Sequence, residues 1–105
     1  MDLLEKKEYY SNLFDFYEGL FTEKQKQYFR EYYFEDLSLG EIAEAYGVSR
    51  NAIYDHLKKI LSQLDFYEER LKLFQKFSER KKLYDEYASK HPETINLINK
   101  LKELE

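Results

Sequence analysis

The segment from Ser38 to Leu57 restricts the fold more than any other part of the chain, because it carries the start and stop signals of two helices. Ser38 and Glu41 have the spacing of a capping box, in which two side chains satisfy backbone amides at a helix start. Gly47 follows where a residue in the left-handed conformation can end that helix without a steric penalty. Ser49 is a preferred N-cap for the next helix. The pattern therefore predicts a helix-turn-helix.

The second helix of this motif is expected from about Arg50 to about Leu64, with one apolar and one polar face. Ala43 on the first helix is small enough to let the two helices cross closely, and Val48 is expected to fill the corner between them. The apolar face is predicted to be buried and consists of Ile53, Leu57, Ile60, Leu61 and Leu64. The opposite face is predicted to be exposed and carries Arg50, Asn51, Tyr54, Asp55, Lys58 and Lys59.

Few residues interrupt helices in the rest of the chain, since its 105 residues include only three glycines and one proline. The intervals between them have helical rather than alternating periodicity, which indicates an all-α protein. Helices are expected over Leu3 to Tyr17 and from Thr22 to about Phe34, the second one starting with another capping box. No stop signal follows Leu64, so the second helix of the motif should lead with a small bend into a long helix.

The C-terminal part of the chain has one clear interruption, at His91 and Pro92. Proline cannot continue a helix but suits a first helical turn, so a terminal helix is expected from Thr94 to Leu104. A chain of this length suits one domain with one core. We therefore expect a single all-α domain over 1–105, with a helix-turn-helix core at 22–64 and a C-terminal helical extension at 65–105.

Several function classes find no support in the sequence. The chain has no cysteine, its two histidines, His56 and His91, lie far apart, and no glycine-rich phosphate loop or serine nucleophile motif is present. We therefore expect no enzyme activity, no catalytic or metal-binding residues and no cofactor. No apolar run suggests membrane insertion or export, so a cytoplasmic protein without membrane insertion is expected.

The charge is distributed unevenly along the chain, whose formal net charge is -4. Residues 48–64 carry Arg50, Lys58 and Lys59 against Asp55, and residues 69–82 are more strongly basic. Residues 1–19 are acidic and therefore form an unsuitable nucleic-acid surface. The second basic segment could follow a phosphate backbone, particularly that of a structured RNA, or could simply be the solvated face of a long helix. Its candidate backbone contacts are Arg70, Lys72, Lys76 and Arg80.

The exposed face of the second helix has side chains suited to reading DNA. Arg50 and Asn51 could reach base edges, since a guanidinium suits guanine and a carboxamide suits adenine, and two lysines could contact phosphates. Asp55 weakens this hypothesis unless its carboxylate accepts from cytosine or pairs with a neighbouring lysine. An ordinary solvated face is the alternative. The candidate nucleic-acid-binding residues are Ser49, Arg50, Asn51, Tyr54, Asp55, Lys58 and Lys59.

Aromatic residues are dense, with 11 tyrosines and 8 phenylalanines. Their spacing follows helical faces, so core and interface positions are expected in preference to stacking platforms for RNA. Neighbouring pairs such as Tyr32 with Tyr33 and Phe66 with Tyr67 give more aromatic surface than one small core needs. The surplus indicates a partner. We expect a homodimer, formed through the first helix or through the long helix after Leu64, which would present two recognition helices.

Several of these segments together resemble the YlxM family, over about Leu4 to Tyr87. The segments are LFDFY from Leu13, LFTEKQ from Leu20, the pair Tyr32 and Tyr33, DLSLGEIAE from Asp36, GVSR from Gly47 and AIYD from Ala52. The resemblance implies a small bacterial DNA-binding regulatory protein whose helix-turn-helix is similar to region 4 of sigma factors. It also implies a link to the signal recognition particle pathway. Asn51 stands where the family often has glutamine, and the tail after about Ala88 has no counterpart in the resemblance.

Two hypotheses follow for the function. In the first, a dimeric regulator places Ser49 to Lys59 in a groove of DNA. In the second, the helix-turn-helix is a scaffold, and the protein is an adaptor that docks onto the RNA or a protein of the signal recognition particle. Replacing Arg50 and Lys58 by alanine should abolish function in the first case and spare it in the second.

Overall fold

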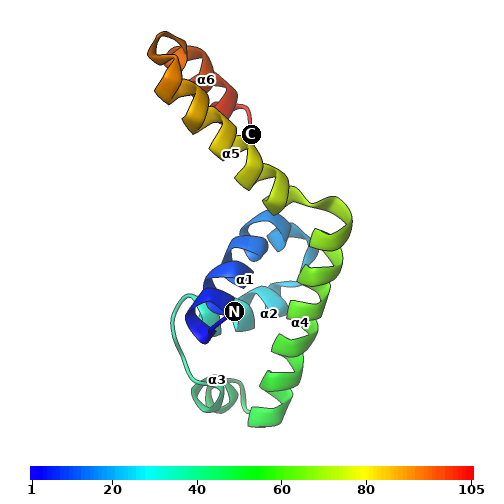
Figure 1. Cartoon of the computed structure of the whole chain (residues 1–105). Coiled ribbons are helices and arrows are strands. Elements are labelled where there is room, and N and C mark those ends of the chain that lie inside the picture. The colour runs from blue at the N-terminus through cyan, green and yellow to red at the C-terminus, as the bar shows by residue number, and fades with distance from the viewer. The chain divides into compact units, whose positions relative to one another are not determined.

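The computed structural model describes residues 1–105 and consists of six α-helices and two short 3-10 helices, without any strand (Figure 1). The prediction of an all-α fold is therefore confirmed. None of the helices is both long and apolar enough to cross a bilayer. The α-helices are α1 (Leu3–Tyr17), α2 (Glu23–Tyr33), α3 (Leu39–Tyr46), α4 (Arg50–Leu71), α5 (Leu73–Lys90) and α6 (Ile95–Glu103), and the 3-10 helices are Glu18–Leu20 and Pro92–Thr94.

The chain divides into two compact units, Met1–Lys72 with α1 to α4 and Leu73–Glu105 with α5 and α6. No helix end lies near Leu64, since α4 continues without interruption to Leu71. The expected division into a core at 22–64 and an extension at 65–105, within one domain, stays a prediction.

The helix starts of the first unit follow the capping signals in the sequence. The backbone N–H of Gln25 donates to Thr22 Oγ1 at 3.2 Å, while the Gln25 side chain accepts from the Thr22 backbone at 2.9 Å. The same reciprocal pair forms between Ser38 and Glu41, at 3.0 and 3.1 Å. Each pair satisfies two amides that a helix start would otherwise leave unbonded. Both predicted capping boxes are confirmed.

The core of the first unit lies where α1, α2 and α3 pack against α4. Aromatic rings fill its centre, with Phe14 of α1 stacked on Phe29 of α2 at a centroid distance of 4.1 Å. The predicted apolar face of α4 is confirmed, since four of its five residues are buried and Leu61 is half-buried. The buried residues of this unit are Leu13, Phe14, Tyr17, Phe21, Tyr28, Phe29, Ile42, Ala43, Ile53, Leu57, Ile60 and Leu64.

The predicted role of Val48 is wrong, because its side chain is 39% exposed. The buried residues of α3 are Ile42 and Ala43, and the first buried residue of α4 is Ile53. The Val48 backbone, rather than its side chain, is used there, since its N–H donates to the carbonyl of Ala43.

The second unit is a helical hairpin of α5 and α6. Pro92 lies in the first turn of the 3-10 helix between them, as its missing N–H and fixed φ favour. Arg80 of α5 pairs with the C-terminal residue Glu105 at 2.7 Å, and Lys102 of α6 pairs with Asp85 of α5 at 3.2 Å. Only Ile98 is buried in this unit, and α5 contributes no buried residue.

Candidate nucleic-acid interface

The turn between α3 and α4 fixes where α4 begins. Gly47 adopts the left-handed conformation with φ of 65°. Its N–H donates to the carbonyl of Glu44 at 3.3 Å, and the N–H of Val48 donates to that of Ala43 at 3.0 Å. This pair of bonds is the Schellman arrangement, which satisfies the last carbonyls of a helix and reverses the chain. The predicted stop at Gly47 is confirmed.

The first turn of α4 presents donors to the surface. Ser49 caps the helix, with its Oγ accepting from the backbone N–H of Ala52 at 3.0 Å, as predicted for an N-cap. No acidic residue lies in this turn, and Arg50 is its first helical residue. A helix N-terminus carries partial positive charge, so this end of α4 is electrostatically suited to a phosphate.

The seven residues proposed from the sequence all lie exposed on one side of the first half of α4 or at its cap. We call them the recognition face: Ser49, Arg50, Asn51, Tyr54, Asp55, Lys58 and Lys59. At helical spacing, Arg50, Tyr54 and Lys58 form one row, and Asn51, Asp55 and Lys59 form the neighbouring row. The predicted separation from the buried face is thus present along three turns of the helix.

The cations of the recognition face are available to a ligand. Neither Arg50 nor either lysine takes part in an ion pair. Asp55 also forms no ion pair, although Lys58 and Lys59 stand at the spacing that would allow one. Asp55 and both lysines line one shallow hollow together with Ser62 and Gln63.

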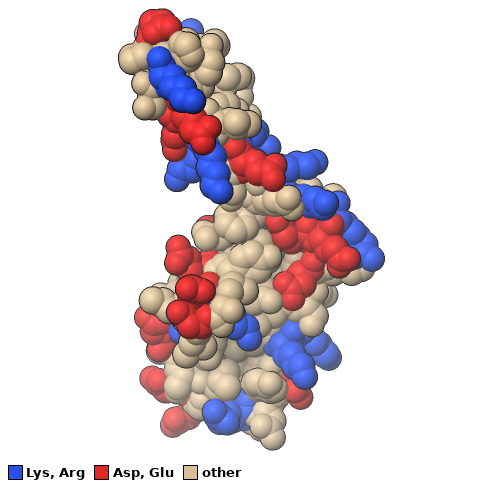
Figure 2. Space-filling view, viewed as in Figure 1, with Lys and Arg blue, Asp and Glu red and all other residues tan.

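Charge changes sign along α4. Residues 50–61 carry three cations and one acid, whereas residues 62–71 carry one cation and three acids. Figure 2 shows Lys and Arg gathered over the first half of α4, and Asp and Glu over its second half and beside α1. Only the first half of α4 therefore has the charge that attracts a phosphate backbone.

His56 lies on the side of α4 that packs against α2. It is half-buried, and its ring lies 5.2 Å from that of buried Tyr28. No group of three or more His, Asp or Glu side chains is close enough to hold a metal ion.

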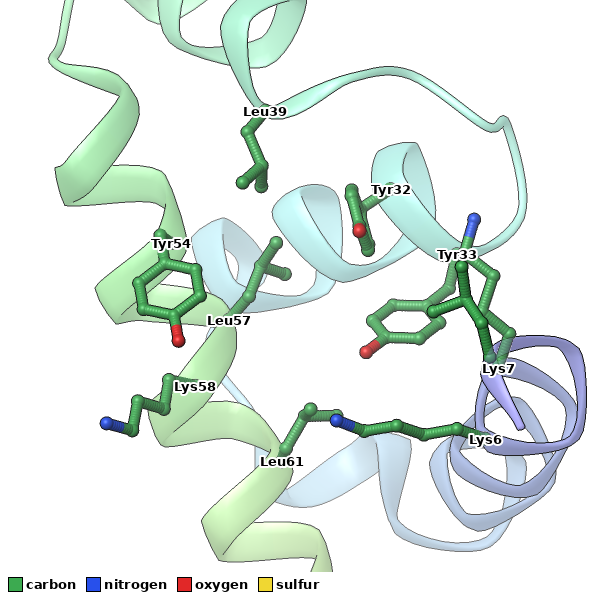
Figure 3. A pocket seen from close by; sticks show the side chains of 10 residues that line it. Lys6, Lys7, Tyr32, Tyr33, Leu39, Tyr54, Leu57, Lys58 and Leu61 are labelled. Atoms are coloured by element: carbon green, nitrogen blue, oxygen red, sulfur yellow. The ribbon is translucent and has the colours of Figure 1, made fainter. Parts of the chain in front are cut away.

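Lys6 and Lys7 were not selected from the sequence as candidate site residues, because residues 1–19 are acidic as a whole. Both line a cavity together with Tyr54 and Lys58 of the recognition face (Figure 3). They are the only cations of α1, and they follow Leu3, which lines the same cavity. A helical projection of α1 could have shown the local basic side, but not which helix it faces.

The comparison with known proteins agrees with the helix-turn-helix geometry. The family model UPF0122, described as "Putative helix-turn-helix protein, YlxM / p13 like", matches residues 4–104. The chain belongs to the UPF0122 family. A UPF0122 protein of Bacillus licheniformis is 49% identical over 105 residues, covering 97% of this chain and 98% of that protein. UPF0122 protein YlxM of Bacillus subtilis is 47% identical over 108 residues, covering 97% and 98%.

The UPF0122 match extends beyond the resemblance found in the sequence. It includes almost all of the hairpin of α5 and α6, and thus the tail after Ala88 that had no counterpart. A UPF0122 protein of a Geobacillus species likewise aligns over 98% of this chain, at 46% identity. The residues that form the hairpin are therefore covered by the family model. The family model describes helix-turn-helix proteins.

The four candidate backbone contacts of this UPF0122 protein are not equivalent. Arg70 and Lys72 belong to the first unit, whereas Lys76 and Arg80 belong to the hairpin. The Arg70 guanidinium lies 3.6 Å from the Phe66 ring centroid and donates to the Phe66 carbonyl. Arg80 is paired with Glu105.

The long basic helix expected from the sequence is interrupted at Lys72. This residue adopts the left-handed conformation with φ of 54° and ends α4. The basic segment is thus split between two helices and two units. Lysine gives no signal for such a turn, because glycine and asparagine are the usual residues there.

Proposed function

We propose that this UPF0122 protein is a DNA-binding regulatory protein that places its recognition face in the major groove. The observation that carries the proposal is the N-terminal half of α4, which follows a tight turn at Gly47 and exposes unpaired cations opposite a buried apolar face. Helix-turn-helix proteins read bases with the N-terminal residues of this second helix. The similarity to sigma-factor region 4 stays part of this proposal.

Each residue of the recognition face has a proposed role. Arg50 donates to guanine and Asn51 pairs with adenine, while Lys58 and Lys59 neutralise phosphates. The Ser49 cap and the free amides of the first turn face the backbone, and Tyr54 lies between these contacts. The unpaired carboxylate of Asp55 would accept from cytosine and repel other contacts, which favours selective over tight binding. Arg70, Lys72, Lys76 and Arg80 are proposed as additional backbone contacts.

We propose that the protein acts as a homodimer. The hairpin supports this, because Leu83, Tyr87 and Leu97 expose 64%, 53% and 61% of their surface. A unit of this size with one buried residue needs further apolar contacts to be stable. Two copies would also bring two recognition helices to neighbouring half-sites. Of the two surfaces expected from the sequence, we propose α5, the first helix after Lys72, in preference to α1.

The second candidate function is an adaptor in the signal recognition particle pathway. The net charge of -4 favours it, since an acidic protein is repelled by nucleic acid at long range. In this version the aromatic and apolar surface docks onto a protein or the RNA of the particle, and the helix-turn-helix is a scaffold. A regulator that acts in the same pathway would reconcile both candidates.

The experiment that tests the proposal is a fluorescence-anisotropy titration of the full chain with two probes, a mixed-sequence DNA duplex and signal recognition particle RNA. Binding to DNA should weaken steeply with salt, and Arg50→Ala should reduce affinity about tenfold or more. Lys90→Ala is the matched control, because this exposed lysine lies in the hairpin and outside both proposed contact sets. Absence of binding to both probes at low salt would overturn the nucleic-acid proposal. Preference for the RNA would favour the adaptor.

A further inference from the structure

A cavity of about 300 Å³ opens beside the first half of α4, within the first unit (Figure 3). Its apolar walls include Leu57 and Leu61 of α4 and the ring of Tyr33 from α2. No aspartate or glutamate lines it, although the chain as a whole is acidic. Its volume is at the lower end of the range found for small-molecule sites, and apolar walls with a few polar groups are typical of them.

Two hydrogen-bond donors converge on this cavity. The Tyr33 hydroxyl points into it and forms no hydrogen bond, while the Lys6 side chain extends across it toward Leu61 (Figure 3). The Tyr33 ring is held in place by stacking on buried Phe29, at a centroid distance of 4.4 Å. Burial raises the pKa of Tyr33 to about 12, so its hydroxyl stays protonated well into the alkaline range.

The other lysines around the cavity are directed elsewhere. Lys7 pairs with Asp36 at 3.3 Å and lies over the Tyr32 ring, 4.8 Å from its centroid. The Lys58 ammonium points away from the cavity (Figure 3). Lys6 forms no ion pair. The cavity thus offers one uncompensated positive charge and one hydroxyl donor beside an apolar wall.

We propose that this cavity binds a small amphipathic anion, a molecule with an aromatic or short aliphatic body and one carboxylate. Lys6 and Tyr33 donate to the carboxylate, and Leu57 and Leu61 contact the body. A carboxylate accepts both donors, and a charge-assisted hydrogen bond to an ammonium is stronger than a neutral one. A ligand with two negative charges would keep one of them unpaired, because Lys6 is the one uncompensated cation of the cavity.

The cavity shares two residues with the recognition face, Tyr54 and Lys58. An occupant that contacts these side chains would change how they meet DNA, so ligand and DNA should weaken each other's binding. This regulatory part of the inference rests on the proposed function, whereas occupancy of the cavity does not.

The first test uses the full chain and the fluorescent anion 8-anilinonaphthalene-1-sulfonate, with octanoate as the competing carboxylate. We expect the dye to bind, octanoate to displace it, Lys6→Glu to weaken both about tenfold or more, and Tyr33→Phe to weaken both severalfold. Lys82→Ala is the control, since this exposed lysine belongs to the hairpin and does not line the cavity. Both test variants keep the packing of the fold, because Lys6 is exposed and Tyr33→Phe retains the ring.

Unchanged dye and octanoate binding in Lys6→Glu and Tyr33→Phe would overturn the site, because the anion would then occupy another apolar surface. Absence of octanoate displacement would overturn it as well. Heteronuclear NMR of the wild-type chain provides an independent readout, in which octanoate should shift the amide signals of Tyr33, Leu57 and Leu61 rather than those of the hairpin.

The second test measures the affinity for the DNA duplex with and without saturating octanoate. We expect octanoate to lower the affinity of the wild-type chain severalfold and to leave that of Lys6→Glu unchanged. Equal DNA affinity with octanoate bound would overturn the regulatory part alone. Failure of the proposed function is distinguishable, because DNA would then not bind even without octanoate, while the dye titration would still report on the cavity.

Discussion

The hydroxyl of Tyr17 donates a hydrogen bond of 2.7 Å to the carboxylate of Glu68, joining the end of α1 to the second half of α4. Tyr17 is only 1% exposed, so this bond lies at the edge of the core. It anchors the acidic half of α4 to α1, at a distance along the helix from the recognition face. Glu68 of α4 thus has a structural role and does not belong to the recognition face.

Removing this hydroxyl should destabilise the fold. For Tyr17→Phe we expect the free energy of unfolding to fall by about 1.5 kcal/mol, since hydrogen bonds to charged groups contribute roughly 1.5 to 3 kcal/mol. Urea denaturation followed by circular dichroism measures the change. Tyr10→Phe is the matched control, because Tyr10 forms the analogous bond to Asp65 at 3.0 Å in an exposed place and should matter less. A larger loss for Tyr10→Phe would contradict this account.

Stability should fall at alkaline pH. Burial raises the pKa of Tyr33 to about 12, and burial followed by the hydrogen bond to Asp65 raises that of Tyr10 to about 12. Unfolded tyrosines lose their protons near pH 10, so the folded state holds more protons between about pH 10 and 12. The stabilisation is complete below pH 10 and is lost as pH rises through this window. Urea midpoints across this range should fall less steeply for Tyr33→Phe, and an unchanged slope would refute the assignment.

The two glycines at either end of α3 should respond in opposite ways to alanine. Gly47→Ala should lower stability by about 1 kcal/mol, because a Cβ disfavours the left-handed conformation found there. No atom lies within 4 Å of such a Cβ, so the effect is one of backbone conformation. Gly40→Ala should raise stability by up to about 1 kcal/mol, since Gly40 lies inside a helix and its added Cβ meets only Ser38 Oγ at 3.9 Å. Thermal melts of both variants measure the contrast, and equal shifts would contradict it.

The helix starts and the buried face of α4 could be predicted because their signals are local. Ser38, Thr22 and Ser49 act on amides within three residues, and the apolar stripe depends only on helical periodicity. The expectation for Val48 failed for another reason, because an apolar residue in a turn does not show whether the turn buries its side chain or uses only its backbone N–H.

The cavity could not be predicted because it depends on tertiary structure. Lys6, Tyr33 and Leu61 belong to three different helices, and no sequence pattern shows that these helices bring the three side chains to one cavity. The division of the basic segment at Lys72 could not be predicted for a different reason. Lys72 has a left-handed backbone conformation, which is unusual for lysine.

Lys72 should be replaceable by glycine with a gain in stability. Its φ of 54° is sterically unfavourable for a residue with a Cβ, so Lys72→Gly should raise the free energy of unfolding by up to about 1 kcal/mol. Lys76→Gly is the control, because Lys76 lies inside α5 and glycine should lower stability there by about 1 kcal/mol. Differential scanning calorimetry measures both. A loss of stability in Lys72→Gly would mean that the side chain contributes more than the backbone relief.

The dimer interface can be assigned by placing a charge on each of the two candidate surfaces. Leu83 on α5 and Leu4 on α1 are 64% and 76% exposed, so Leu83→Glu and Leu4→Glu should both leave the monomer fold intact. If the hairpin forms the dimer, Leu83→Glu buries an unpaired carboxylate at the interface and should weaken self-association at least tenfold, whereas Leu4→Glu should not. Sedimentation equilibrium over a concentration series measures both variants. The reverse pattern would assign the interface to α1, and a wild-type chain that stays monomeric would refute the dimer altogether.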